Sequence, residues 1–176
     1  MKKNVYKLFW AWQFEQEEQW LKQCSSRGMQ LIDVGFMRYT FEMDNPEVYN
    51  YKVELLNYWP THAESESYIR FVEETGAEMV GSMMRWVYFR KAKRLGAFDL
   101  FSDRESKIKH LNRVLALFVP LFVMELVLGL MNVSIPRTMN RVVGILALLV
   151  CALIGYGVYK ILMKRSQLKK EHVIFE

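Results

Sequence analysis

The sequence predicts an α+β protein in which a mixed N-terminal domain precedes a two-helix transmembrane hairpin. Two long apolar segments with one charged residue each, residues 114–135 and 142–163, lie near the C-terminal end. Before them, segments with strand-like and helix-like patterns alternate over residues 1–95. The charge also divides: the chain up to Ser106 has 14 basic and 16 acidic residues, whereas the chain from Lys107 has 10 basic and 3 acidic residues. Basic residues that flank apolar segments are typical of membrane proteins.

The first part of the N-terminal domain reads as strand, helix and strand. Residues 5–12 are aromatic and favour a strand. Residues 15–26 favour a helix, because acidic side chains crowd the first turn and Gly28 follows the last one. Residues 31–42 favour a further strand that is broken at Gly35.

The second part repeats a similar order of patterns. Residues 48–56 alternate between apolar and polar side chains, as a half-buried strand does. Residues 63–75 favour a second helix, which Gly76 ends, and residues 79–90 favour a last strand.

This order of elements is that of the ferredoxin-like split β-α-β fold. We therefore expect a βαββαβ domain over residues 1–95, with a four-stranded antiparallel sheet and both helices on one face. A juxtamembrane linker helix is expected over 96–113, the hairpin over 114–163 and a tail over 164–176.

The two apolar segments have 22 residues each, enough for a hydrocarbon core of about 30 Å. The loop between them has two basic residues, whereas the outer flanks have seven. By the positive-inside rule, this asymmetry predicts a two-span protein of the cell membrane with both termini in the cytoplasm.

Glu125 is the one acidic residue within these two segments. In an antiparallel hairpin it lies level with about Ala152, so Tyr156 is within one turn and able to donate a hydrogen bond. A carboxylate at this depth indicates either a proton- or ligand-coupled site or a polar contact that fixes the hairpin or an oligomer. Small residues at 147, 151 and 155 favour close contact between the helices.

Helices on one face of a sheet leave the other face open, and the predicted strands are rich in aromatic residues. The rings proposed for a partner-binding or ligand-binding face are Trp10, Trp12, Tyr49, Tyr51, Trp86 and Tyr88. A dimer interface, a small-molecule platform and ordinary core packing all remain open for them. The negative charge of the domain argues against direct binding of nucleic acid.

No catalytic or metal-binding pattern is recognisable. The histidines are scattered, Cys24 and Cys151 are far apart, and Glu17 and Glu18 point to different helix faces. We therefore expect neither an enzyme nor a cofactor. Before the first apolar segment, Ser102 and Glu105 form a candidate capping box beside a junction motif of Asp103, Ser106 and Lys107.

Several short motifs resemble those of the bacterial domain-of-unknown-function 2812 family. They are Glu17-x-x-Trp20-Leu21, Gly28-x-x-Leu31, Tyr39-x-Phe41-Glu42, Pro46, Tyr49-x-Tyr51, Tyr68-Ile69, Gly76, Trp86-x-Tyr88-Phe89-Arg90 and Asp103-x-x-Ser106-Lys107. Met29 and Ala77 depart from the family pattern, which has Trp after each helix-ending glycine. The resemblance implies a cytoplasmic domain on a membrane anchor, often encoded beside a PadR-like repressor, without established catalytic residues.

The leading hypothesis is a membrane-anchored, non-enzymatic regulatory or sensory module. Its cytoplasmic domain would bind a partner protein, such as a PadR-like repressor, or a small apolar ligand on the aromatic face. The alternative is an accessory subunit of a transporter or envelope-stress complex, in which Glu125 meets a membrane partner.

Overall fold

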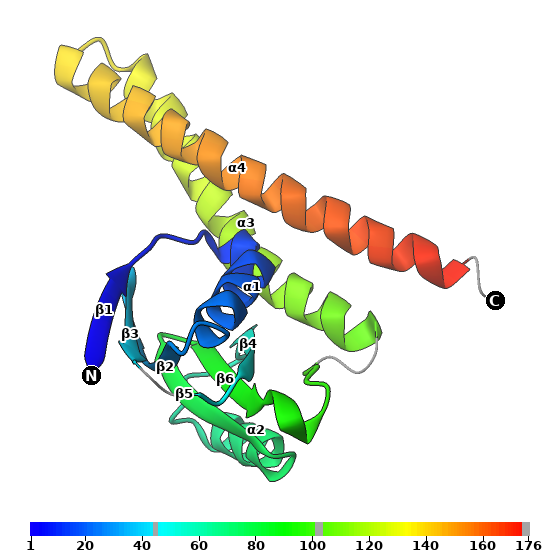
Figure 1. The fold of residues 1–176 in the computed structure, drawn as a ribbon. Helices are drawn as coiled ribbons and strands as arrows, with labels where there is room; N and C mark the ends of the chain where they lie inside the picture. Colours follow the sequence, from blue (N-terminus) through cyan, green and yellow to red (C-terminus); the bar gives the residue numbers. More distant parts are fainter. Residues whose placement is uncertain (44–45, 101–103, 174–176) are drawn as a thin grey trace. The chain divides into compact units, whose positions relative to one another are not determined.

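The computed structural model describes residues 1–43, 46–100 and 104–173. The chain divides into two compact units, Met1–Asp103 and Arg104–Glu176. The first unit contains all the strands and two helices, and the second consists of two long helices (Figure 1). The α+β class and the two C-terminal apolar helices are therefore as predicted.

The first unit consists of two halves with the same order of elements. The elements of the first half are β1 (Lys2–Tyr6), a 3-10 turn (Ala11–Gln13), α1 (Phe14–Ser25), β2 (Gln30–Gly35) and β3 (Arg38–Glu42). The elements of the second half are β4 (Tyr49–Leu55), α2 (Ala63–Glu74), β5 (Ala77–Met83) and β6 (Trp86–Ala92). Each half is thus a strand, a helix and a hairpin.

Each half forms a three-stranded antiparallel sheet with its last strand in the centre, in the orders β1-β3-β2 and β4-β6-β5. The two sheets meet along β2 and β5. Gly81 permits this approach, since a Cβ atom there would lie 3.2 Å from the backbone nitrogen of Val34. Arg90 also donates a hydrogen bond of 2.9 Å to the carbonyl of Leu31 across the junction.

The predicted four-stranded ferredoxin-like sheet is not confirmed. The strands predicted at 31–42 and 79–90 are each a hairpin, whose two-residue loops are 36–37 and 84–85. Neither loop has the Asn-Gly or Asp-Gly pair that signals such a turn. Met37 and Met84 supply positive φ angles of 54° and 55°, which are uncommon for residues other than glycine.

The first predicted strand, 5–12, also differs from the structure. β1 ends at Tyr6, and residues 11–13 form the 3-10 turn that leads into α1. β-Propensity predicted a strand for this aromatic run because rings are enriched in strands, but the same rings pack in a connection here.

The two helices of the first unit are confirmed, as are their ends. Gly28 and Gly76 follow them with φ angles of 77° and 84°, in the left-handed region that glycine adopts without strain. At the start of α2, Nδ1 of His62 accepts a hydrogen bond of 3.3 Å from the amide of Glu64. Both first turns hold acidic residues, which the helix dipole favours.

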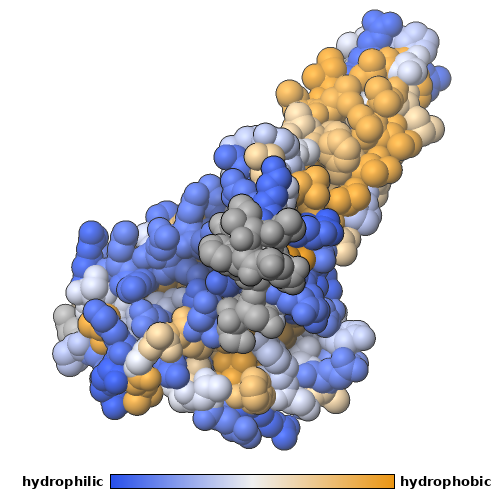
Figure 2. All heavy atoms as spheres, turned by 90° about the vertical axis from the view of Figure 1, so that its right-hand side faces the viewer, coloured by the Kyte–Doolittle hydropathy of each residue, from blue (hydrophilic) through white to orange (hydrophobic). Residues whose placement is uncertain are grey.

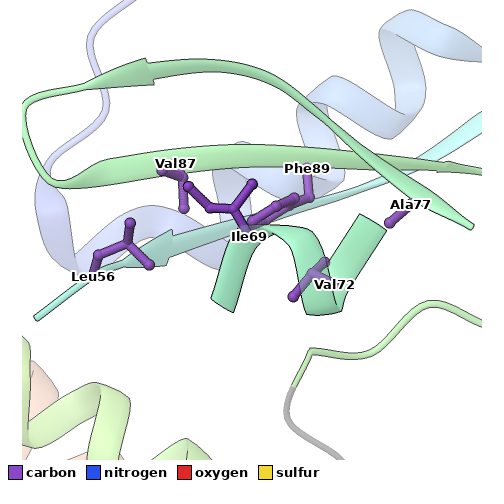
Figure 3. Packing of buried hydrophobic residues seen from close by; sticks show 6 residues of the cluster. All are labelled: Leu56, Ile69, Val72, Ala77, Val87 and Phe89. Carbon is purple, nitrogen blue, oxygen red and sulfur yellow. The ribbon is translucent and has the colours of Figure 1, made fainter. Parts of the chain in front are cut away.

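A core cluster joins α2 to the sheet of the second half (Figure 3). Ile69 and Val72 of α2 pack toward Val87 and Phe89 of β6, and Phe89 is 0% exposed. The cluster accounts for the spacing of the apolar residues in α2. They recur every three or four positions because that spacing places them on the side of the helix that faces the sheet.

The second unit consists of α3 (Arg104–Ser134) and α4 (Thr138–Val173). Both are long and apolar enough to cross a membrane. Apolar side chains cover most of their visible surface (Figure 2). Of the linker helix predicted over 96–113, residues 104–113 form the start of α3, residues 96–100 are not helical, and residues 101–103 lie outside the described residues.

α3 and α4 approach closely at three glycines. These are Gly129 against Leu148, Gly144 against Val133 and Gly155 against Phe122. A Cβ atom at Gly144 would lie 2.7 Å from the backbone nitrogen of Val133, so only glycine fits there. The same register places Glu125 level with Ala152, as predicted for an antiparallel hairpin.

Replacing Phe89 by Ala is expected to destabilise the first unit by about 3–5 kcal/mol, since it leaves a cavity in the core cluster. Phe71→Ala is the matched control in α2. Phe71 is 63% exposed, so its loss should change the free energy of unfolding by less than about 0.5 kcal/mol. Urea titration followed by tryptophan fluorescence measures both, because all five tryptophans lie in the first unit. Equal effects of the two variants would contradict the described core.

Candidate functional site

A small pocket opens in the first unit beside the connection between β1 and α1. Its volume is about 110 Å³. Both halves of the unit contribute to its wall, since both hairpins reach it through Phe36 and Met83. Aromatic rings dominate the lining, namely Phe9, Trp10, Phe14, Phe36, Tyr39, Trp86 and Tyr88.

The carboxyl group of Glu17 lies in the wall of this pocket and is only 6% exposed. The hydroxyl of Tyr39 donates to its Oε1 at 2.6 Å, and the hydroxyl of Tyr88 donates to the same oxygen at 2.8 Å. These two bonds join α1 to β3 and to β6, the central strands of the two sheets. Within the described residues, no side chain or backbone group donates to Oε2 of Glu17.

Burial is the largest influence on the pKa values of Glu17, Tyr39 and Tyr88. It raises the pKa of Glu17 above its usual value, and the two tyrosine hydrogen bonds oppose that shift. The pKa values of Tyr39 and Tyr88 are also raised, first by burial and then by the neighbouring Glu17 carboxylate. Both tyrosines therefore stay neutral donors at physiological pH. Hydrogen bonds from neutral donors offset part of the cost of a buried carboxylate.

One ring of the pocket wall, Phe9, and one ring outside the lining, Trp20, already contact a cation of this chain. The ammonium of Lys7 lies 4.8 Å from the ring centre of Phe9 and 4.6 Å from that of Trp20. Trp20 also meets the ring of Tyr39 edge-on at 4.9 Å. The faces of this aromatic cluster are therefore oriented so that positive charge is favourable near them.

The structure brings three of the sequence-predicted aromatic residues to this pocket: Trp10, Trp86 and Tyr88. Trp12 does not line the pocket, but its ring stacks on Trp10 with centres 5.3 Å apart and planes 2° from parallel. The rings therefore meet around a concave site rather than on an open sheet face.

The other two predicted rings lie elsewhere. Tyr51 is 3% exposed, and its hydroxyl accepts a hydrogen bond of 3.0 Å from the amide of Leu31. Burial raises the pKa of Tyr51 to about 12. The ring of Tyr49 lies 4.6 Å from the guanidinium of Arg90. Tyr51 therefore stabilises the contact between β4 and β2 and offers no exposed face for a ligand.

The predicted intramembrane and junction residues belong to the second unit. Glu125 is half-buried in α3, and Tyr156 is 53% exposed with its ring 5.5 Å from the ammonium of Lys160. The hydrogen bond from Tyr156 to Glu125 stays a prediction. Ser106 and Lys107 lie in the first turn of α3, whereas Asp103 and the proposed cap Ser102 lie outside the described residues.

No local pattern in the sequence connects Glu17 with Tyr39, and Glu17 and its neighbour Glu18 point to different helix faces. One signal was present, because Glu17, Tyr39 and Tyr88 each lie in a different one of the motifs that support the family resemblance. Those motifs are far apart in sequence, so their meeting required the folded sheets.

Two other kinds of site are less well supported. A broader depression of about 520 Å³ lies between α1 and β4, but Glu18, one of its two carboxylates, is already bound to Lys52 at 3.1 Å. In residues 1–43, 46–100 and 104–173, no group of three or more His, Cys, Asp and Glu residues could hold a metal ion.

The fold and the pocket define an α+β domain with an aromatic site, followed by two apolar helices of membrane-spanning length. A family model described as "Protein of unknown function (DUF2812)" matches residues 13–123, which is more than half of the chain. The chain therefore belongs to the DUF2812 family, as the motifs predicted. No curated protein and no solved structure matches it.

Replacing Glu17 by Gln is expected to change how stability depends on pH. Because the folded-state pKa of Glu17 is raised, the folded chain keeps this proton at pH values where the unfolded chain has lost it. Glu17 therefore lowers the free energy of unfolding as pH rises from below its unfolded pKa through its folded one. Glu17→Gln removes this decline, so its stability relative to the native chain should improve from about pH 4 to about pH 8.

Urea titrations at both pH values measure this difference. Glu64→Gln, at an exposed position in the first turn of α2 and outside the pocket, is the control for a Glu-to-Gln replacement as such. If the native and Glu17→Gln curves run parallel, Glu17 does not titrate in the way that its burial requires.

Proposed function

We propose that this chain is a membrane-anchored, non-enzymatic sensory module whose N-terminal domain binds a small apolar ligand in the Glu17 pocket. The observation that carries the proposal is the pocket itself, a concave aromatic site with one buried carboxyl group. An engineered apolar cavity of about 150 Å³ is large enough to bind benzene. A pocket of about 110 Å³ therefore suits a ligand, or a part of a ligand, about the size of one aromatic ring.

The position of the pocket supports a sensory role. Its wall includes residues from α1 and from both hairpins, so a ligand would contact both halves of the domain. Binding would then favour one arrangement of the two sheets and their loops over others. A partner protein that recognises this arrangement would receive the signal, and a PadR-like repressor is the proposed partner. Homo-oligomerisation is a second means of transmitting it.

The two apolar helices would hold this domain at the cytoplasmic side of the cell membrane. Their length and hydropathy support spanning. The excess of basic residues outside the hairpin supports placing both termini in the cytoplasm. The ligand would then come from the cytoplasm or from the inner face of the bilayer.

Benzene, toluene and indole are suitable probes of the pocket. With the full chain in a maltoside detergent, at least one should raise the unfolding midpoint of the first unit, measured by tryptophan fluorescence. A ligand at about 100 times its Kd stabilises by about 2.7 kcal/mol. Trp86→Ala removes part of the wall and should reduce the ligand-dependent shift, whereas Trp59→Ala should not, because Trp59 is exposed and outside the pocket. The proposal fails if no probe shifts the midpoint.

A second candidate function is an accessory subunit of a transporter or envelope-stress complex. Glu125 favours it, because a half-buried carboxyl group lies amid an apolar helix, level with Ala152. A membrane partner with a polar or basic group would stabilise such a residue.

Glu125→Leu separates the two functions. If a membrane partner contacts Glu125, the variant should lose co-purification with that partner after crosslinking in native membranes, while ligand binding to the first unit is unchanged. Val127→Leu, an exposed apolar position two residues away, is the control. Unchanged crosslinks in Glu125→Leu would remove the main support for an accessory subunit.

A further inference from the structure

We infer that the Glu17 pocket binds a small organic ammonium ion, with the Glu17 carboxylate as its counter-ion and aromatic rings as its walls. The inference rests on the proposed function and specifies its ligand class. Three observations support it: only one of the two carboxylate oxygens accepts hydrogen bonds from described residues, aromatic rings line the pocket, and the charged groups of the pocket are unevenly distributed.

The two oxygens of Glu17 have different surroundings. Tyr39 and Tyr88 both donate to Oε1, whereas no described residue donates to Oε2. Glu17 lines the pocket, so Oε2 is the oxygen of this buried carboxyl group that has no donor among the described residues. A neutral apolar ligand would cover this oxygen and offer it neither a hydrogen-bond donor nor a positive charge. A ligand with a positive nitrogen would supply the missing charge.

The rings of the pocket suit the same ligand. Trp10 and Trp86 line the pocket from two different elements. Trp10 lies in the connection before α1, and Trp86 lies at the start of β6. A quaternary or alkylated ammonium over such rings gains cation–π attraction, which strengthens when water is excluded. The ammonium of Lys7, already placed over Phe9 and Trp20, is a cation of this chain that uses the neighbouring rings in this way.

The charges of the pocket favour a cation at depth. Apart from the two neutral tyrosines, its titratable lining residues are Glu17 and Lys7. Glu17 is buried and Lys7 is exposed, so the negative charge lies inside and the positive charge lies at the rim. An organic anion would have to approach the buried carboxylate, which costs energy in a site of low dielectric constant. Lys7 weakly opposes a cation, and its removal should therefore help one.

Three probes of nearly equal shape test the inference. They are choline, its neutral isostere 3,3-dimethylbutan-1-ol and the anion 3,3-dimethylbutanoate. Each is titrated into the full chain in an uncharged maltoside detergent at constant ionic strength, with tryptophan fluorescence as the measurement. Choline should bind at least about tenfold more tightly than the alcohol. The anion should bind most weakly.

Two variants assign the preference to residues. Glu17→Gln should lower the affinity for choline about tenfold while leaving the affinity for the alcohol unchanged. Lys7→Gln should raise the affinity for choline. Glu64→Gln, which is outside the pocket lining, should change neither the affinity for choline nor that for the alcohol. If Glu17→Gln does not fold, the comparison of the three probes on the native chain and on Lys7→Gln still decides the matter.

The outcomes separate this inference from the proposed function. Equal binding of choline and the alcohol, or tighter binding of the anion, overturns the ammonium ligand and leaves an apolar-ligand site. Equal loss of choline and the alcohol in Glu17→Gln means that Glu17 only supports the fold, which also overturns it. Binding of none of these probes, together with no effect of benzene, toluene or indole, overturns both proposals.

Discussion

The buried carboxyl group of Glu17 is the constraint on which the first unit depends. It accepts hydrogen bonds from Tyr39 and Tyr88, and so it ties one helix to the central strand of each sheet. A carboxyl group with this degree of burial is costly unless donors surround it. The two tyrosines supply donors on one side only. The arrangement that holds the halves together therefore also leaves Oε2 without a donor among the described residues.

The repeated strand-helix-hairpin topology explains why the pocket lies where it does. Two similar halves meet along β2 and β5, where Gly81 and the contact from Arg90 to Leu31 keep the sheets close. The hairpins of both halves then reach the same pocket. A site with walls from both halves would respond to changes in either, which supports the sensory role that we propose. The helical hairpin is organised differently, by glycines that let two apolar helices approach closely.

The candidate site was only partly predictable. Aromatic content and alternation pointed to Trp10, Trp86 and Tyr88, which line the pocket, but the same reasoning also selected Tyr51, which is buried in the contact between β4 and β2. Composition identifies rings that need burial or a partner and does not distinguish between these two fates. Glu17 was not selected because no local pattern marks an acidic residue on a helix as buried.

The sequence by itself determined the features that depend on neighbouring residues. These are α1 and α2 with their terminal glycines, the two long apolar helices, their antiparallel register and the motifs of the DUF2812 family. Tertiary structure alone decided the pairing of the strands and the meeting of Glu17 with tyrosines 22 and 71 residues away. Helices and their caps follow from local periodicity, whereas the pairing of strands depends on contacts between distant segments. Here the two hairpin turns also lack the Asn-Gly or Asp-Gly pair that would have predicted them.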